Sequence, residues 1–221
     1  MVKIGVFDSG IGGKSVANKL EVLFPEAQII FANDPEHVPY GSRTPSEVTA
    51  LTKAAIQPLI AANCDAIVIA CNTATTNSIG DLRTAYPNTH FVGIEPMVKP
   101  AAALTKSGTI AVLATPSTLA SPRYAQLKAE YTTDITVIEP DCSTWASLIE
   151  RNGMNQQEIR KVVEQIQHAG ADIAVLGCTH YHWIKEDIQS ILGPNVTILE
   201  PSDAIGARLD SLLSTDSEPL Q

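Results

Sequence analysis

Residues 67–73, Ile-Val-Ile-Ala-Cys-Asn-Thr, and residues 174–180, Ala-Val-Leu-Gly-Cys-Thr-His, decide the fold of this 221-residue chain. Each stretch is a short, nearly continuous apolar run that ends at a cysteine followed by small polar residues. Such a run is typical of a strand buried on both faces, as in a parallel sheet covered by helices. Because the two stretches match residue type for residue type, they predict two similar α/β units.

Two further matches have nearly the same offset along the chain. Residues 3–9 align with residues 109–115, and Ile94-Glu95-Pro96 aligns with Leu199-Glu200-Pro201. Three matched points with a nearly constant offset indicate a duplicated half. The alternative is that the similarity arises by chance, because any two α/β units contain similar short apolar strand sequences. Two related halves that face each other form a cleft with pseudo-twofold symmetry, and ligands favour such interfaces.

Apolar runs alternate with helix-like stretches along the whole chain. We expect strands at residues 3–7, 28–32, 66–70, 90–94, 109–114, 135–138, 173–176 and 196–199. Helices are expected between them, for example over residues 45–62 and 155–169. The expected fold class is α/β, with two pseudo-symmetric domains, each a mostly parallel sheet flanked by helices, and the active site in the interdomain cleft. We assign residues 1–96 and 203–221 to the first domain and residues 97–202 to the second.

Composition limits the partners and the location of the protein. The formal net charge of -9 disfavours nucleic-acid binding, which needs a basic surface. No apolar run approaches the roughly 20 residues that span a bilayer, and the chain starts directly in a strand pattern, without signal-peptide features. Four cysteines without close spacing indicate reduced thiols. We therefore expect a cytoplasmic protein that binds neither membranes nor nucleic acids, with a disordered polar tail from Ser214 to Gln221.

Cys71 and Cys178 occupy the place in each half where chemistry is expected. Both follow an apolar strand at the point where the chain turns toward a helix, and this carboxyl edge is where open α/β sheets bind ligands. A helix N-terminus or a protonated His180 would lower the pKa of a nearby thiol. Cysteine is often merely a packing residue, but equivalent cysteines in two duplicated halves favour a chemical role. Cys64 and Cys142 have no such counterparts, so we interpret both as structural.

Two facing thiols suit one reaction in particular. Inverting a Cα centre requires removal of a proton from one face and its return to the other, so two acid/base groups must stand on opposite sides of the carbon. The cysteine pair therefore predicts a cofactor-independent amino-acid racemase. Asp8 and His180 are the candidate helpers; the alternative for Asp8 is a helix N-cap. The glycine turn after Asp8 is a poor dinucleotide motif, because Ser15 stands where its last glycine belongs.

Six motifs along the chain resemble those of the glutamate racemases, within the PLP-independent aspartate/glutamate racemase superfamily. They are Asp8-Ser9-Gly10-x-Gly12-Gly13, Pro39-Tyr40-Gly41, Ala70-Cys71-Asn72-Thr73-Ala74, Gly93-Ile94-Glu95-Pro96, Ala114-Thr115-x-x-Thr118 and Gly177-Cys178-Thr179-His180-Tyr181. They occur in the family's order, and the resemblance runs from Lys3 to about Leu213. It departs at His182, where the family usually has proline, at Lys14, where leucine is common, and in a shorter second half.

The resemblance implies a role for each matching residue. Cys71 and Cys178 would be the two acid/bases, each acting on one enantiomer, with Asp8 assisting Cys71, His180 assisting Cys178, and Glu150 near the second cysteine. The alternative for Glu150 is a solvated carboxylate at a helix end. Contacts to the substrate would come from Asp8, Ser9, Tyr40, Gly41, Asn72, Thr73, Thr118, Thr179 and His180. The implied partner is a small amino acid, with no cofactor and no metal; the implied role is to supply D-glutamate for peptidoglycan, and a homodimer is compatible with the family.

Three other interpretations remain open from the sequence. Cys178, His180 and His182 alternate and could ligate zinc. A relative with the same architecture could act on aspartate, hydantoins or another small acid, although the two cysteines argue against the one-cysteine decarboxylases, and Asp8-Ser9 and Pro39-Tyr40-Gly41 favour glutamate over aspartate. The chain could also be a non-catalytic amino-acid-binding relative, as its shortness hints.

Overall fold

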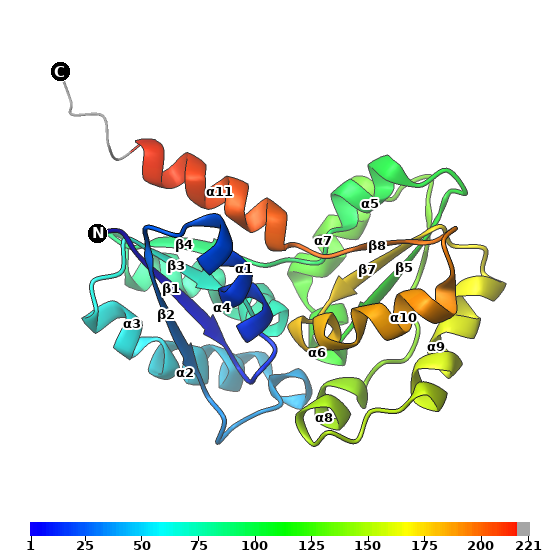
Figure 1. Cartoon of the computed structure of the whole chain (residues 1–221), viewed down its shortest axis with the longest axis horizontal. Helices are drawn as coiled ribbons and strands as arrows, with labels where there is room; N and C mark the ends of the chain where they lie inside the picture. The colour runs from blue at the N-terminus through cyan, green and yellow to red at the C-terminus, as the bar shows by residue number, and fades with distance from the viewer. Residues whose placement is uncertain (216–221) are drawn as a thin grey trace.

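Two four-stranded parallel sheets form the framework of the protein, as a computed structural model describes it for residues 1–215 (Figure 1). The first sheet has the order β2-β1-β3-β4 and the second the order β6-β5-β7-β8, so the two halves share one topology. The strands are β1 (Lys3–Asp8), β2 (Gln28–Asn33), β3 (Ala66–Ile69), β4 (His90–Gly93), β5 (Thr109–Ala114), β6 (Thr136–Ile138), β7 (Ile173–Gly177) and β8 (Thr197–Leu199). The predicted α/β class and all eight predicted strands are confirmed.

Helices connect the strands and cover the sheets. In chain order they are α1 (Lys14–Leu23), the 3-10 helix η1 (Tyr40–Ser42), α2 (Pro45–Ala55), α3 (Gln57–Ala61), α4 (Asn72–Ala85), α5 (Val98–Leu104), α6 (Pro116–Leu119), α7 (Pro122–Tyr131), α8 (Trp145–Glu150), α9 (Gln156–His168), the 3-10 helix η2 (Thr179–Ile184), α10 (Lys185–Leu192) and α11 (Ser202–Thr215). The predicted helix at 155–169 is α9, which the Asn155 side chain caps through two backbone N–H groups.

Two expectations about helices are wrong. The single helix predicted over residues 45–62 is broken at Ile56 into α2 and α3. Pro58 has no N–H to donate to the preceding turn, so α2 stops and α3 starts with proline in its first turn. The tail expected to be disordered from Ser214 is helical through Thr215, since α11 extends that far; the rest of that tail lies outside the described residues.

Alternate residues of each strand pack on opposite faces of the sheet, as a buried parallel sheet requires. In the first half, Val6 and Val68 are neighbours in register and lie in the core cluster that α1 and α11 cover. Phe7 and Ile69 are also neighbours in register, but they lie in the opposite cluster with residues of α2 and α4. The second sheet is likewise packed on both sides. Apolar packing on both faces explains why the strands read as continuous apolar runs.

The chain passes between the halves twice. It leaves the first sheet after β4 and enters the second half with α5, and it returns after β8 with α11, which contacts α1, β3 and β4 (Figure 1). The domain boundaries given above, residues 1–96 with 203–221 and residues 97–202, stay a prediction; the end of the first domain falls partly outside the described residues. Within residues 1–215, no helix is long and apolar enough to cross a membrane.

Prediction for the core of the second half. Trp145 is 1% exposed and stacks edge-on against Tyr181, with ring centroids 5.2 Å apart. Replacing it in Trp145→Ala removes a large buried side chain and leaves a cavity, so the free energy of unfolding should fall by about 3–5 kcal/mol in a urea titration followed by circular dichroism. The control is Trp183→Ala at a 48% exposed tryptophan, where a loss below about 1 kcal/mol is expected. Equal losses in the two variants would contradict this packing.

Candidate active site

Both predicted cysteines line one enclosed cavity between the two sheets. The free space in it is about 10 Å³, roughly the room for one water molecule. The first half supplies residues from β1, the loop at η1 and the start of α4, and the second half supplies residues from the ends of β5 and β7, from α8 and from η2. The lining consists of Ser9, Pro39, Tyr40, Gly41, Cys71, Asn72, Thr73, Thr115, Ala146, Cys178, Thr179 and His180.

Cys71 is placed by the turn from β3 into α4. It is the N-cap residue of α4, and its Sγ accepts a hydrogen bond from the Ala74 N–H at 3.4 Å. The Ser9 hydroxyl lies 3.4 Å from the same sulfur. Burial, followed by the negative charge of Asp8, raises the pKa of Cys71 to about 12, although both hydrogen bonds oppose this. The helix N-terminus was expected to lower this pKa; burial outweighs it, so in the closed cavity Cys71 is a neutral thiol.

Cys178 has a different set of neighbours. Its Sγ lies 3.7 Å from Nδ1 of His180, and Nε2 of the same ring lies 2.5 Å from Oε1 of Glu150. Burial alone lowers the pKa of His180, but the hydrogen bonds to Cys178 and Glu150 outweigh it and raise the pKa to about 11. The bond to His180 in turn holds the pKa of Glu150 below its usual value. The arrangement is a relay in which a protonated imidazole joins a carboxylate to a sulfur.

Glu150 is therefore part of the site and is not a solvated carboxylate. It ends α8, its side chain is 16% exposed, and Oε1 also accepts the Ile11 N–H at 3.0 Å. Ile11 belongs to the first half and Glu150 to the second. The contact thus ties the turn after β1 to the relay at Cys178.

Asp8 lies at the boundary of the halves and does not cap a helix. The N-cap of α1 is Gly13, and no side chain caps that helix. Asp8 is fully buried, with Oδ2 accepting the Gly10 N–H at 3.0 Å and Oδ1 accepting the Thr179 hydroxyl at 2.9 Å. Its influence on Cys71 is the charge described above, because both oxygens are already engaged elsewhere.

Three threonine hydroxyls form a cluster at the cavity, which Thr73 and Thr115 line and Thr118 does not. Thr73 Oγ1 lies 2.9 Å from Thr115 Oγ1 and 3.2 Å from Thr118 Oγ1, and the latter two are 3.0 Å apart. Thr73 and Thr118 were predicted as substrate contacts, whereas Thr115 was not. Thr115 could have been predicted as a site residue from the sequence, because the alignment of residues 3–9 with 109–115 makes it the counterpart of Ser9. Ala146 was also missed, and no pattern in the sequence marks it.

The side-chain amide of Asn72 lines the cavity and is 2% exposed. Neither its Oδ1 nor its Nδ2 has a hydrogen-bond partner within residues 1–215. A buried amide without partners is costly. Because Asn72 lines the cavity, a polar ligand there would satisfy it.

The loop that carries Tyr40 and Gly41 closes the cavity from the first half. The Tyr40 hydroxyl donates to Oδ2 of Asp34 at 2.7 Å, and burial together with this bond raises the pKa of Tyr40. A Cβ on Gly41 would lie 2.8 Å from the Cβ of Thr115, closer than packed carbon atoms approach. Glycine at this position therefore permits the two halves to touch.

The alternation of Cys178, His180 and His182 does not produce a metal centre. Nδ1 of His182 lies 3.1 Å from Ser15 Oγ, whereas Nε2 of His180 is bound to Glu150. Among residues 1–215, no group of three or more His, Cys, Asp or Glu side chains is placed to hold a metal ion. All four cysteines are free thiols.

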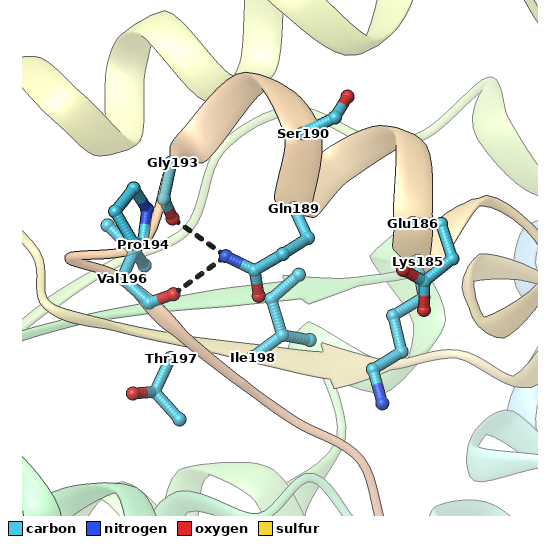
Figure 2. Close-up of a pocket in the computed structure, with 9 residues that line it drawn as sticks. All are labelled: Lys185, Glu186, Gln189, Ser190, Gly193, Pro194, Val196, Thr197 and Ile198. Atoms are coloured by element: carbon cyan, nitrogen blue, oxygen red, sulfur yellow. Dashed lines mark hydrogen bonds between the residues drawn. The ribbon is translucent and has the colours of Figure 1, made fainter.

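A larger hollow of about 690 Å³ lies on the outside of the second half, between α10 and β8 (Figure 2). Figure 2 shows Gln189 on its wall, with Nε2 donating to the carbonyl groups of Gly193 and Val196 at 2.7 Å and 3.1 Å. Its lining contains no cysteine and no residue of the relay. The hollow is therefore separate from the site that the sequence predicted.

Known proteins resemble this chain in sequence. Residues 13–208 match the family model for Asp/Glu/Hydantoin racemase. The chain is 36% identical over 215 residues to the glutamate racemase of Pseudomonas putida (strain W619), covering 96% of this chain and 81% of that protein.

Two solved structures are similar over nearly the whole chain. Escherichia coli glutamate racemase in complex with L-glutamate and the activator UDP-MurNAc-Ala has a TM-score of 0.87 at 28% identity, over 96% of this chain and 82% of that one. Francisella tularensis glutamate racemase in complex with D-glutamate has a TM-score of 0.83 at 27% identity, over 100% of this chain and 84% of that one. The fold and the family assignment therefore rest on independent matches in sequence and in structure.

Prediction for the relay. In Glu150→Gln the carboxylate that faces His180 becomes neutral, so the pKa of His180 should fall from about 11 toward 6.5. The raised pKa of His180 contributes to the free energy of folding; this contribution is fully present below pH 6.5 and is lost as the pH rises through about 11. In Glu150→Gln the same contribution should be lost at a lower pH than in wild type. Nitrogen-15 NMR titration of the histidine rings measures the pKa. Glu164→Gln on the exposed side of α9 is the matched control, and an unchanged His180 titration in Glu150→Gln would contradict the relay.

Proposed function

The chain belongs to the Asp/Glu/Hydantoin racemase family, and we propose that it interconverts L-glutamate and D-glutamate with Cys71 and Cys178 as the two acid/base groups. It is an amino-acid racemase and therefore an isomerase. The observation that carries the proposal is that two cysteines from equivalent strand ends of the two halves face the same enclosed cavity. Two thiols on opposite sides of one Cα are what an inversion of configuration needs.

The reaction moves one proton off the substrate and another onto it. A thiolate on one side takes the α-proton and becomes a thiol, the electron pair stays on the substrate as a carbanion, and the thiol on the other side protonates the opposite face and becomes a thiolate. The sum of thiols and thiolates is unchanged, and the reverse reaction exchanges their roles. Each cysteine is thus the base for one enantiomer.

The two sulfurs have different surroundings. Burial and the charge of Asp8 raise the pKa of Cys71, whereas Cys178 faces the imidazole of His180, which Glu150 binds on its other side. An ammonium group bound beside Cys71 would offset its raised pKa and allow it to act as a base as well. Burial of both sulfurs strengthens these electrostatic effects.

Recognition of glutamate follows from the polar walls of the cavity. The hydroxyls of Thr73, Thr115 and Thr118 can donate to a carboxylate, and the unpartnered Asn72 amide can serve the amino or carboxylate group of the substrate. The relatives with bound L-glutamate and D-glutamate support this choice of ligand. Ser9, Tyr40, Gly41, Thr179 and His180 would complete the contacts.

The cleft has to open for the substrate to enter. The free volume of about 10 Å³ is far below that of a glutamate molecule, since roughly one water molecule fills it. Gly41 and Thr115 touch across the halves, so their separation would admit the ligand. Closure around it would restore the dry site.

The biological setting is proposed on the resemblance alone. The D-glutamate produced would serve peptidoglycan synthesis, the protein would act in the cytoplasm, and a homodimer would be its assembly. The net charge of -9 supports a small-molecule partner over a nucleic acid.

Prediction for the activity. The purified protein, incubated with L-glutamate in D₂O without pyridoxal phosphate, should replace the α-proton signal of glutamate with deuterium in proton NMR, and chiral chromatography should detect D-glutamate. Exchange of aspartate in place of glutamate would keep the mechanism and change the substrate. Folded protein with reduced thiols that exchanges the α-proton of no amino acid would refute the proposal.

Prediction for the two thiols. A serine hydroxyl is a far weaker acid than a thiol, so Cys71→Ser and Cys178→Ser should each lower kcat for racemisation by about 10³-fold or more, within the span of effects seen for essential acid/base groups. Cys64→Ser is the matched control, because Cys64 lies outside the cavity lining; it should retain wild-type kcat within about threefold. Near-normal kcat in either cavity variant would exclude the two-thiol mechanism.

A further inference from the structure

His182 makes a hydrogen bond between the two halves that the mechanism does not use. It lies in η2, two residues after His180, and its Nδ1 is 3.1 Å from Oγ of Ser15 in the first turn of α1. The two residues are 167 positions apart in the chain. His182 is also where the sequence departs from the proline usual in the glutamate racemases.

The direction of this bond follows from the second contact of the serine. Ser15 Oγ donates to the Gly12 carbonyl oxygen at 2.9 Å. A hydroxyl has one hydrogen, so while Ser15 donates to Gly12 it accepts from His182. In this arrangement Nδ1 carries the proton, and Nε2, which is buried and has no hydrogen-bond partner among residues 1–215, is an unprotonated acceptor. Burial lowers the pKa of His182, which agrees with this neutral form.

The segment that His182 holds is the turn after β1, which packs against the start of η2. Through Ser15, the bond reaches the carbonyl of Gly12. A Cβ on Gly12 would lie 2.7 Å from the backbone N of His180 and 2.7 Å from Oγ1 of Thr179, so this turn packs directly on the two residues that follow Cys178. The same turn contains Ile11, whose N–H binds Glu150.

We propose that His182 is a positioning residue: by donating to Ser15, it holds the turn at residues 10–15 against Thr179 and His180 and so sets the position of the relay relative to Asp8. It is not among the residues that line the cavity. The proposal rests on the proposed function, in that its effect on catalysis requires a racemase. Proline at this position could form no such bond, because it has no side-chain donor.

The main test compares kinetic constants in a set of variants. His182→Leu removes the donor and Ser15→Ala removes the acceptor; each should lower kcat about tenfold in both directions of racemisation, with KM within about threefold of wild type. Misplacement of catalytic groups by about 1 Å can cost up to about 10² in rate, while Thr73, Thr115 and Asn72, which would supply most of the substrate binding, lie away from this turn. His182→Asn places an N–H near the position of Nδ1 and should recover kcat to within about threefold.

The double variant decides whether the two residues act through one bond. Ser15→Ala with His182→Leu should be no slower than the slower single variant, since the same hydrogen bond is already lost. The matched controls are His168→Asn and Ser190→Ala, an exposed histidine on α9 and an exposed serine on α10; both should keep wild-type kcat. A His182→Leu enzyme within threefold of wild-type kcat, or losses that multiply in the double variant, would overturn the proposal.

A second measurement does not depend on activity. Amide hydrogen exchange followed by mass spectrometry should be faster over residues 11–15 in His182→Leu and in Ser15→Ala than in wild type, and unchanged over α9. Unchanged exchange in the turn would overturn the positioning role. If the wild type failed to exchange the α-proton of glutamate, the proposed function would fall, while this measurement would still decide whether His182 holds the turn.

Discussion

The buried carboxylate of Asp8 constrains the rest of the structure. A carboxyl group removed from water is costly unless hydrogen bonds satisfy its oxygens, and Asp8 is fully buried. One donor to Asp8, the Gly10 N–H, comes from its own half; the other, the Thr179 hydroxyl, comes from the opposite half. Both oxygens of Asp8 are therefore satisfied only where the halves pack together. The same packing buries the two sulfurs and leaves Asp8 close enough to raise the pKa of Cys71, so the position of the halves and the electrostatics of the site depend on one another.

The duplicated fold gives the cysteines equivalent positions, and the side chains around them make the two positions chemically different. Cys71 has hydroxyl and backbone donors together with a nearby negative charge. Cys178 has an imidazole backed by the carboxylate of Glu150. The duplicated backbone therefore places the two sulfurs alike, whereas the neighbouring side chains give each sulfur its own electrostatic environment.

Continuous apolar runs predicted the strands well, because burial on both faces leaves an unambiguous pattern. The break between α2 and α3 was missed because helix periodicity continues through Pro58, although its lack of an N–H stops the hydrogen-bond ladder. The sequence also placed both cysteines at strand ends. It could not predict the raised pKa of Cys71, because desolvation depends on how closely the other half packs over the sulfur. Thr115 could be predicted from its alignment with Ser9. Ala146 could not, because it lines the cavity only as a result of where α8 packs.

One short segment of the first half makes several contacts with the second half. Thr179 binds Asp8, Glu150 binds the Ile11 N–H, and His182 binds Ser15, so residues 8–15 receive three hydrogen bonds from the second half. These partners lie on α8 and η2, the elements that also carry the relay to Cys178. Under the proposed function, an opening that separates this turn from α8 and η2 would break all three bonds, and closure would reform them. The turn after β1 thus serves both as a contact surface between the halves and as the support of the Asp8 carboxylate, through the Gly10 N–H.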